Sequence, residues 1–167
     1  MKSIAIEELN KYVNPLTVRS DPAILVATDG RETNGLTIGW ASFGTLWHKY
    51  SASVYIHKSR YSKHIFDNVE YFAICFFDDK YKDKLKYFGT VSGKDEDKMV
   101  NGGLTVETGE AAPYFAESRV VVLCKKMGQC DFNAESCDET VWDWYHKDGV
   151  HTQYMGEIVK ILVAEIM

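Results

Sequence analysis

Five segments of the chain have the hydrophobic patterning of β-strands. In SASVYIHK (51–58), apolar and polar residues alternate, which predicts a strand with one buried and one polar face. The other four are continuous apolar runs, or runs rich in aromatic and β-branched residues, as buried strands are. These runs are AILVAT (23–28), EYFAICFF (70–77), RVVVLCKK (119–126) and EIVKILVAEI (157–166). The chain is therefore expected to fold mainly as strands.

The segment SRYSKHIFDNV (59–69) has the spacing of a short helix. Tyr61, Ile65 and Val69 recur at intervals of four residues and so share one helical face. Ser59 precedes this pattern and is placed to cap the N-terminus of the helix. The sequence therefore predicts a helix that begins directly after Ser59.

A second helix is predicted over DDKYKDKLKYFG (78–89). Its apolar stripe consists of Tyr81, Leu85 and Phe88. An aspartate can cap the start of this helix, and Gly89 is placed to end it.

Together these elements favour a mainly antiparallel β-barrel with a few short helices over a doubly wound sheet. The strands outnumber the helices and do not alternate with them regularly. The polar stretch 90–103 is expected to be a loop, and 138–149 to add one or two helical turns before the last strand. Since the chain has no internal repeat and no linker rich in proline or serine, residues 1–167 are expected to form a single domain.

Composition and charge argue against several classes of function. The net charge is −5, so the chain lacks the basic field that nucleic-acid binding requires. No segment has the pattern of a secretory signal or a membrane span, and we therefore expect a cytoplasmic protein. The four cysteines contain no C-x2-C pair and the histidines no H-E-x-x-H motif. We expect no metal site and reduced thiols, with Cys75 in a buried strand.

Common nucleotide and hydrolase motifs are missing from the sequence. No G-x-G-x-x-G occurs, and GTVSGKD (89–95) is one residue short of a P-loop and has Asp95 in place of the magnesium-binding hydroxyl. Ser42 lies in W-A-S-F-G, without the glycine that a nucleophile elbow places two residues earlier. The sequence therefore identifies no covalent nucleophile.

The start of the first predicted helix gathers groups that bind anions. SRYSK (59–63) places two hydroxyls, Arg60 and Lys63 beside N–H groups that a helix start leaves without partners. A helix dipole contributes only about 0.3–1 kcal/mol, whereas a hydrogen bond to a charged group contributes about 1.5–3 kcal/mol. Arg60 is therefore expected to matter most. Taken alone, the segment is better explained as an ordinary capped helix that carries basic surface residues, because such caps are common.

The stretch TNGLTIGWASFGTLW (33–47) has an unusual composition. It contains no charged residue, yet it has three glycines, four hydroxyl side chains and two tryptophans. Glycines let the backbone approach the edge of a ring, and Trp40 offers a flat apolar wall. With an anion site nearby, this composition favours a ligand with a phosphate at one end and a flat ring at the other, as in a flavin. Core packing is the alternative for both tryptophans, and we expect it for Trp47.

These segments, in this order and spacing, resemble the flavin reductase-like, FMN-binding split-barrel family, in particular its flavoredoxin-like branch. The resemblance spans nearly the whole chain. The segments that carry it are NGLTIGWASFGTLW, VYIHKSRYSKHIFDN, YFAICFF, YKDKLKYFGTVSGKDEDKM, VVVLCKKMGQCDF and HTQYMGEIVKIL. It implies a split, Greek-key-like β-barrel that forms a homodimer, with one FMN per subunit at or near the dimer interface.

The resemblance also implies which residues bind FMN. Those near the ring and the ribityl chain are Thr37, Trp40 and Ser42, and those in the segment that meets the phosphate or the ribityl chain are Arg60, Tyr61 and Ser62. Lys98 and His151 match positions that approach the isoalloxazine ring, where a cation would favour the reduced flavin. Without the resemblance, Lys98 is equally consistent with a solvated charge and His151 with a structural histidine.

The chain departs from many members of the family at two places. It reads HKYSASVY where many relatives have a proline after the Leu-Trp pair, so the lip of the site near residues 48–51 is expected to differ. Met127 and Gly128 stand where many relatives carry tyrosines, so the resemblance does not define how a substrate reaches the site.

The resemblance implies an FMN-binding oxidoreductase of the flavin reductase or flavoredoxin type. Electrons would pass from NADH, NADPH or a protein donor through the flavin to an acceptor, and the protein would position the ring and tune its potential. One alternative is an FMN-binding module without turnover, which would act as a store, a sensor or an electron carrier for a redox protein. Another is a split barrel that has lost its cofactor and serves as a structural dimer.

Overall fold

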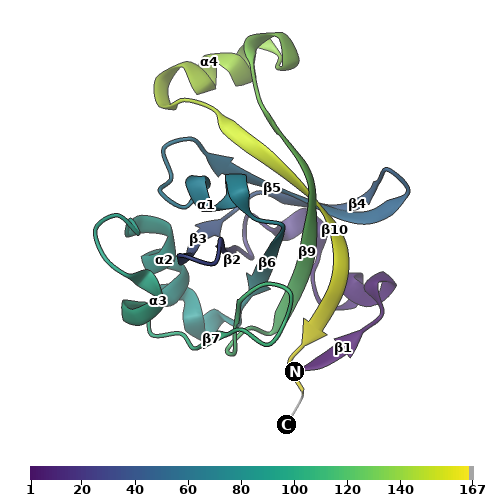
Figure 1. Cartoon of the computed structure of the whole chain (residues 1–167). Coiled ribbons are helices and arrows are strands. Elements are labelled where there is room, and N and C mark those ends of the chain that lie inside the picture. The colour runs from purple at the N-terminus through teal and green to yellow at the C-terminus, as the bar shows by residue number, and fades with distance from the viewer. Residues whose placement is uncertain (166–167) are drawn as a thin grey trace.

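The computed structural model describes residues 1–165, apart from the side chains of residues 147 and 148. Its main element is an eight-stranded antiparallel sheet in the order β3-β2-β6-β9-β10-β5-β4, with β1 paired to β10 (Figure 1). The strands of this sheet are β1 (Lys2–Ile4), β2 (Ala23–Thr28), β3 (Thr33–Ile38), β4 (Ala41–Leu46), β5 (Lys49–His57), β6 (Tyr71–Phe76), β9 (Val120–Asp131) and β10 (His151–Val163). The short strands β7 (Val106–Glu107) and β8 (Tyr114–Phe115) form a separate ladder.

The helices are short. The α-helices are α1 (Lys63–Asn68), α2 (Lys82–Thr90), α3 (Lys98–Asn101) and α4 (Glu139–Asp148). The 3-10 turns are η1 (Ile6–Lys11), η2 (Pro15–Thr17), η3 (Asp79–Tyr81) and η4 (Ala134–Ser136). The sheet bends so that β3 also contacts β5, although the two are far apart in its strand order. The predicted mainly β, antiparallel barrel with a few short helices is confirmed.

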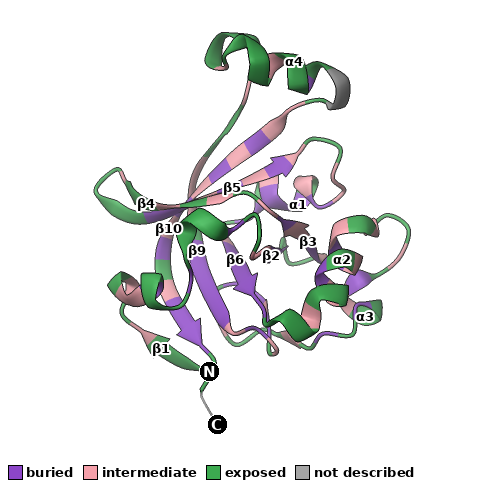
Figure 2. Ribbon diagram, turned by 180° about the vertical axis from the view of Figure 1, so that it is seen from behind, coloured by how far each residue is buried: buried purple, intermediate pink, exposed green. Residues whose placement is uncertain are grey.

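Both faces of the central strands are buried, which explains their continuous apolar runs. On β2, Leu25 belongs to the core inside the curved sheet, whereas Ile24 and Val26 belong to a second core on the other face. Leu85 and Phe88 of α2 pack into this second core. Figure 2 shows the buried residues concentrated in the middle of the sheet. The fold therefore has an interior core and an outer core that α2 covers.

The predicted strands agree with the structure, with some shifts at their ends. The run 23–28 coincides with β2, and 51–58 and 70–77 match β5 and β6 to within two residues at either end. The run 119–126 is the first part of the longer β9. The last run lies in β10, which begins six residues earlier, at His151, and ends at Val163; residue 166 lies outside the described residues. Cys75 is buried in β6, as predicted.

Three helix predictions need correction. Helix α1 begins at Lys63 rather than directly after Ser59, because Ser59 forms a hydrogen bond with His57 instead of a cap. Helix α2 runs on to Thr90, so Gly89 lies within it rather than at its end. The expected loop 90–103 contains the short helix α3.

The predicted turns at 138–149 form α4, which at 10 residues is longer than expected. Asp138 caps it by accepting hydrogen bonds from the N–H groups of Thr140 and Val141, and Gly149 ends it with a φ of 85°. In Figure 1, α4 stands above the rest of the fold on the ends of β9 and β10. Within residues 1–165, no helix has both the length and the apolar character needed to cross a bilayer.

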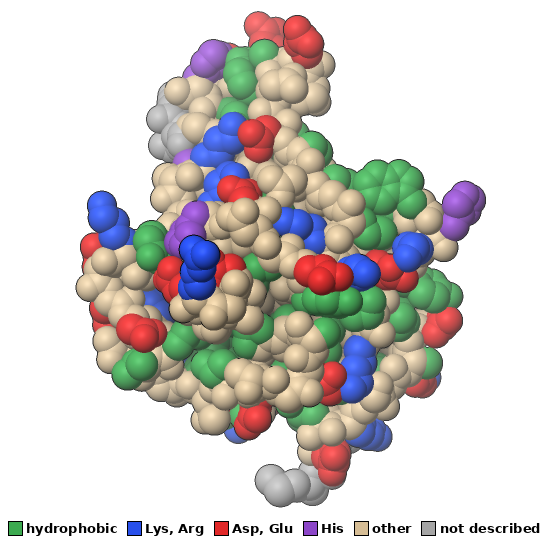
Figure 3. Space-filling view, in the orientation of Figure 1, with side chains coloured by type: hydrophobic (Ala, Val, Ile, Leu, Met, Phe, Trp, Pro, Cys, Tyr) green, Lys and Arg blue, Asp and Glu red, His purple; other side chains and the backbone are tan. Residues whose placement is uncertain are grey.

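The prediction that Trp47 packs in the core is wrong. Trp47 and His48 form the two-residue turn between β4 and β5, and both have positive φ angles, of 49° and 60°. The Trp47 residue is 58% exposed at this tip. Hydrophobic side chains gather over the β4 hairpin on the surface (Figure 3). The apolar side chain of Trp47 therefore lies at the surface of the molecule and not in its core.

Candidate functional site

Two adjoining cavities lie where β3, β5, β10 and α2 meet the segment before α1. The larger, which we call the Trp40 cavity, has a volume of about 330 Å³, and its wall includes Thr37, Trp40 and His151. The smaller, the Arg60–Lys98 cavity, has a volume of about 120 Å³. Leu36 and Arg60 line both cavities, so together they form one bent site.

Arg60 stands between the two cavities. Its Nη2 donates a hydrogen bond to the carbonyl oxygen of Gly89 in α2 at 2.7 Å. Partial burial lowers the pKa of Arg60 from its usual range. Among residues 1–165, no carboxylate forms an ion pair with Arg60.

Lys98 is a second cation at the same site. It is only 3% exposed, and its Nζ donates to the carbonyl oxygen of Phe88 at 3.3 Å. Burial, and secondarily the positive charge of Arg60, lower the pKa of Lys98 to about 8. Lys98 also has no carboxylate ion-pair partner among the described residues. Two neighbouring cations without a counter-charge create a positive potential that would attract an anion.

Hydroxyl groups complete the wall of the Arg60–Lys98 cavity. They come from Ser59, Tyr61, Ser62, Thr90 and Ser92. A hydroxyl can donate one hydrogen bond, for example to a phosphate oxygen. Three of these hydroxyls already donate within the protein: Ser59 to His57, Tyr61 to Glu32, and Thr90 to the carbonyl oxygen of Lys86. Because α1 starts only at Lys63 and has six residues, an anion in this cavity would be held by side chains and not by a helix dipole.

The Trp40 cavity has a flat aromatic wall. The ring centroids of Trp40 and His151 lie 4.5 Å apart, and Trp144 of α4 stacks near His151 with an interplanar angle of 11°. Nδ1 of His151 is buried and has no hydrogen-bond partner among the described residues. Burial, together with His57, lowers the pKa of His151 to about 4. At neutral pH, His151 is therefore uncharged and can form a hydrogen bond but does not act as a cation.

His57 ties the Trp40 cavity to the segments around it. Its Nε2 lies 3.1 Å from the carbonyl oxygen of Gly149, and its Nδ1 lies 2.7 Å from Oγ of Ser59. A carbonyl oxygen can only accept a hydrogen bond, so Nε2 carries the proton and Nδ1 accepts from Ser59. The ring thus links the end of α4 to the start of the 59–63 segment.

Comparison with known proteins identifies the family. A family model described as "Flavin reductase like domain" matches residues 18–166. The chain belongs to the flavin reductase-like family. A comparison with curated proteins gives no match.

Several solved structures share the fold of this flavin reductase-like chain. Flavoredoxin from Methanosarcina acetivorans is 22% identical with a TM-score of 0.71, over 99% of this chain and 77% of that one. Flavoredoxin of Desulfovibrio vulgaris (Miyazaki F) is 24% identical with a TM-score of 0.67, over 87% and 70%. An NADH:FAD oxidoreductase of Streptomyces globisporus C-1027 is 14% identical with a TM-score of 0.66, over 86% and 75%.

The flavin reductase-like fold brings together all but one of the site residues expected from the sequence. Thr37, Trp40 and His151 line the Trp40 cavity, and Arg60 lines both cavities. The residues that line only the smaller cavity of these two are Tyr61, Ser62 and Lys98. Lys98, expected beside the ring of the ligand, lines the smaller cavity together with Arg60 and does not line the Trp40 cavity. Ser42 lines neither cavity, since it is exposed on β4 opposite Ser53 of β5.

Sequence reasoning did not select two residues of this flavin reductase-like site. His57 was visible only as a member of the polar face of the strand 51–58, a face whose other members include Tyr55 of the same cavity. Gly89 was interpreted as a helix end. In the structure it gives its carbonyl oxygen to Arg60, and a Cβ on it would lie 3.3 Å from Cβ of Thr37. Neither role can be recognised from the local sequence.

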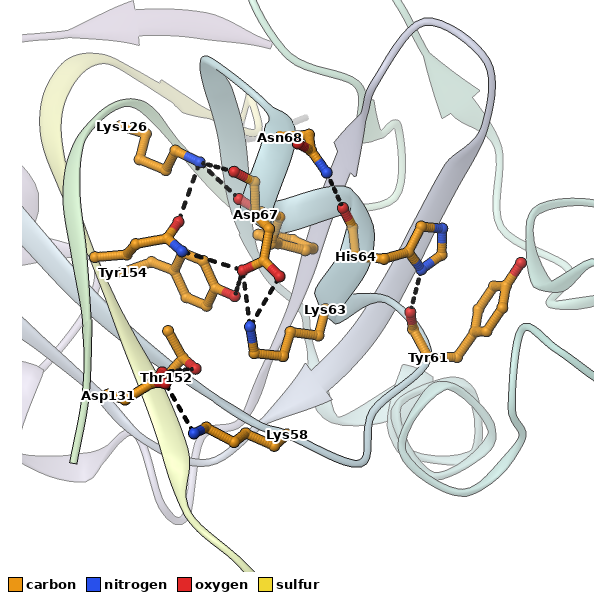
Figure 4. A network of polar contacts seen from close by, with 12 residues as sticks. Lys58, Tyr61, Lys63, His64, Asp67, Asn68, Lys126, Asp131, Thr152 and Tyr154 are labelled. Carbon is orange, nitrogen blue, oxygen red and sulfur yellow. Dashed lines mark hydrogen bonds and ion pairs between the residues drawn. The ribbon is translucent and has the colours of Figure 1, made fainter. Parts of the chain in front are cut away.

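A polar network on the other side of α1 holds the Arg60 segment in place (Figure 4). Asp67 accepts hydrogen bonds from Lys63 at 2.8 Å and from the buried Tyr154 at 2.6 Å. Burial alone would raise the pKa of Asp67, but the hydrogen bonds from Lys63 and Tyr154 outweigh it and the pKa is lowered. Lys126 of β9 donates to the carbonyl oxygens of Phe66 and Asp67. Helix α1 is therefore anchored to β9 and β10.

Among the described residues, no three histidine, cysteine or acidic side chains come together as a metal site.

Proposed function

We propose that this chain is an FMN-binding oxidoreductase of the flavin reductase or flavoredoxin type. Electrons would pass from NADH, NADPH or a protein donor through the flavin to an acceptor. The observation that carries the proposal is the pair of cations, Arg60 and Lys98, in a hydroxyl-lined cavity that adjoins the aromatic Trp40 cavity. The names of the structural relatives, flavoredoxin and NADH:FAD oxidoreductase, support the same class of ligand.

The Arg60–Lys98 cavity fits the phosphate of FMN. A phosphate monoester carries close to two negative charges at neutral pH, which would balance the two cations. Ser62, which is buried, lines the same wall and would donate a hydrogen bond, whereas the Tyr61 hydroxyl on this wall already donates to Glu32 at 3.2 Å. The like charges that oppose each other in the ligand-free protein would thus become favourable contacts in the complex.

The Trp40 cavity fits the ring and the adjoining ribityl chain. Trp40 would provide a flat wall, and His151 would offer the buried Nδ1 that lacks a partner within the protein. Thr37, next to this wall, donates through Oγ1 to the carbonyl oxygen of Leu85 at 2.5 Å, which fixes its side chain at the ligand side of α2. We retain Ser42 as a ring or ribityl contact only through the family resemblance.

When bound, FMN supplies one- and two-electron transfer chemistry, and the protein supplies binding, orientation and electrostatics. Trp40 would orient the ring, and Arg60 and Lys98 would hold the phosphate. His151 would act as a neutral hydrogen-bonding group. No residue is required as a covalent nucleophile or as a general base.

We also propose a homodimer, as the resemblance implies. Trp40 is 41% exposed beside its cavity, and Trp144 next to it is also exposed, so this side of the site is open to a second subunit. A cytoplasmic location suits the cysteines, which are all free in the described residues.

The first experiment is spectroscopic. The purified protein, after incubation with FMN and removal of excess ligand, should be yellow and show a flavin absorbance spectrum. Under anaerobic conditions, NADH or NADPH should bleach this spectrum if a nicotinamide is the donor; bleaching only by a reduced redox protein would select the electron-carrier alternative. A protein that stays colourless after incubation with FMN contradicts the proposal.

Arg60 provides a matched test of the binding site. Because Arg60→Ala removes charged hydrogen bonds to the phosphate, FMN affinity should fall about 10- to 100-fold. Lys2→Ala removes one positive charge from an exposed residue of β1 that lines neither cavity and should leave the affinity unchanged. Equal affinities of the two variants would show that the phosphate site is misplaced.

A further inference from the structure

A third cavity, which we call the Asn34 cavity, adjoins the Arg60–Lys98 cavity. Its volume is about 310 Å³. Gly93 and Lys98 line both cavities, so the Lys98 side chain forms part of the boundary between them. A reactant that met the Lys98 amine could therefore place one part of itself in each cavity.

The two cavities differ in the charge of their walls. In the described part of the chain, Arg60 and Lys98 are the only charged residues that line the Arg60–Lys98 cavity. The charged residues of the Asn34 cavity are two cations and three carboxylates, namely Arg31, Lys98, Glu32, Glu96 and Asp97. The first cavity therefore favours an anion, whereas the second disfavours an anion and suits a neutral group.

The three carboxylates of the Asn34 cavity do not neutralise Lys98. Glu32 and Glu96 accept hydrogen bonds from other side chains, and Asp97 caps α3 by accepting from two of its N–H groups. Within residues 1–165, none of the three forms an ion pair with Lys98. The amine of Lys98 is therefore not held in its charged form by a nearby acid.

Lys98 has the properties of a nucleophilic lysine. Burial and the charge of Arg60 lower its pKa to about 8, so about a tenth of it is neutral near pH 7, where an ordinary lysine is almost entirely charged. Only the neutral amine has a lone pair that can attack a carbonyl carbon. Nζ of Lys98 donates to the carbonyl oxygen of Phe88, and this hydrogen bond leaves the lone pair of the neutral amine free.

The Asn34 cavity also contains a buried amide donor without a partner. Asn34 is only 2% exposed and lines this cavity together with Lys98. Its Nδ2 has no hydrogen-bond partner among the described residues, which is unfavourable for a buried donor. A Cβ at Gly93 would lie 2.1 Å from this nitrogen, so a glycine is needed there for the amide to keep its place. The carbonyl oxygen of an acyl group on Lys98 would offer Nδ2 an acceptor.

We propose that Lys98 is a modification site that acyl phosphates acylate. The phosphate would lie beside Arg60, and the acyl group would enter the Asn34 cavity. The neutral Nζ of Lys98 attacks the acyl carbon, a carbon–nitrogen bond forms, and the bond from that carbon to the phosphate oxygen breaks. The proton lost by the nitrogen passes to the departing phosphate, which leaves as hydrogen phosphate. The products are an amide on Lys98 and inorganic phosphate, and no oxidant or reductant takes part.

Acylation would remove the positive charge of Lys98. Arg60 would then be the one cation left among the described residues of the Arg60–Lys98 cavity, so a phosphate group would bind there more weakly. The acylation itself requires no flavin, whereas its effect on FMN binding rests on the proposed function. Modification of Lys98 would in this way regulate the loading of the flavin site.

The test uses acetyl phosphate as the probe. The flavin-free full chain is incubated with it at about pH 7.5, and the acetylated lysines are quantified over time by peptide mass spectrometry. Lys98 should be acetylated at least about tenfold faster than Lys94, an exposed lysine of the same polar stretch. Inorganic phosphate should slow the reaction at Lys98 but not at Lys94. Equal rates at the two lysines, or no protection by phosphate, would overturn the inference, because ordinary surface chemistry would then explain the labelling.

Variants separate docking of the phosphate from general reactivity. Arg60→Ala removes a phosphate contact and also a charge that keeps the Lys98 amine neutral, so acetylation of Lys98 should slow about tenfold or more. Lys2→Ala removes an exposed charge that lines neither cavity and should leave the rate unchanged. Asn34→Ala should slow the reaction about tenfold or more, since it removes the donor to the acyl oxygen. An unchanged rate in Arg60→Ala would overturn the inference. The comparison of Lys98 with Lys94 needs no variant and decides the matter if a variant does not fold.

The effect on the flavin site is measured separately. After acetylation, FMN affinity should fall about 10- to 30-fold, and Lys98→Met treated in the same way should show no further fall. FMN binding without preferential acetylation of Lys98 would overturn this inference alone. Preferential acetylation of Lys98 in a chain that does not bind FMN would support the modification site and contradict the proposed function.

Discussion

Two clusters of basic residues flank the segment around α1. They differ in whether a carboxylate balances their positive charge. On one side, Lys63 forms an ion pair with Asp67, and Lys126 donates to two main-chain carbonyl oxygens (Figure 4). On the other side, Arg60 and Lys98 share a cavity, and among the described residues the side chain of each has only a main-chain carbonyl oxygen as its hydrogen-bond partner. Both clusters are at least partly buried, so the difference lies in their counter-charges and not in exposure.

We infer from this difference that the Asp67 cluster stabilises the fold, whereas the Arg60–Lys98 pair is suited to bind an anion. A buried cation with its carboxylate has already recovered part of its desolvation cost within the protein. A buried cation without one recovers that cost only when an anion binds. The Asp67 cluster should therefore contribute to stability, whereas the Arg60–Lys98 pair should contribute to binding and reduce the stability of the ligand-free protein.

The largest effect is expected at Asp67. Asp67→Ala leaves Lys63 and the buried hydroxyl of Tyr154 without their acceptor, so the free energy of unfolding should fall by about 2–4 kcal/mol. Chemical denaturation of the apoprotein measures this change. The control, Asp79→Ala, removes an exposed carboxylate paired with Lys82 and should cost less than about 1 kcal/mol. If the two variants were equally stable, the Asp67 cluster would not be the structural anchor that its geometry indicates.

Lys98 should show the opposite behaviour. Lys98→Met removes a desolvated charge next to Arg60 and keeps an apolar chain of similar length, so the apoprotein should be unchanged or more stable by about 1 kcal/mol. At the same time, FMN affinity should fall about 10- to 30-fold. Lys94→Met, at an exposed lysine of the same polar stretch, should alter neither quantity. Loss of stability in Lys98→Met would place Lys98 with the structural cluster instead.

The sequence was a good guide to the sheet because the relevant signal is local. Both faces of β2 and β6 are buried, and continuous apolar runs report this directly, without knowledge of the partner strands. The segment of Arg60 and its hydroxyl neighbours could also be selected as a candidate anion site, since these residues are adjacent in the chain.

The remaining features depend on contacts between distant segments. The position of Lys98 beside Arg60 follows from the packing of α3 against β3, which no local pattern in 90–103 reveals. Ser59 was expected to cap a helix, but His57 competes for its hydroxyl group. Trp47 was expected in the core because its size and apolarity favour burial, yet the hairpin turn places it at an exposed tip. In each case tertiary geometry overrode a reasonable local preference.

The smallest expected effect is a pH dependence of stability and FMN affinity that arises from Lys98 of the Arg60–Lys98 pair. The folded apoprotein holds the pKa of Lys98 near 8, below the ordinary 10.5. Between these values the unfolded chain binds more protons, so this group makes the apoprotein more stable as the pH rises. A bound phosphate favours charged Lys98 and raises its pKa again, so FMN binding takes up a proton.

The affinity for FMN should therefore fall several-fold between about pH 7 and about pH 9, as Lys98 of the apoprotein loses its charge. Fluorescence titration at a series of pH values measures this fall, and Lys98→Met should bind weakly but with a flat profile over the same range. Arg60 keeps its charge throughout and cannot produce the dependence. A profile that is equally steep in the variant would assign the titration to another group and remove Lys98 from the phosphate contacts.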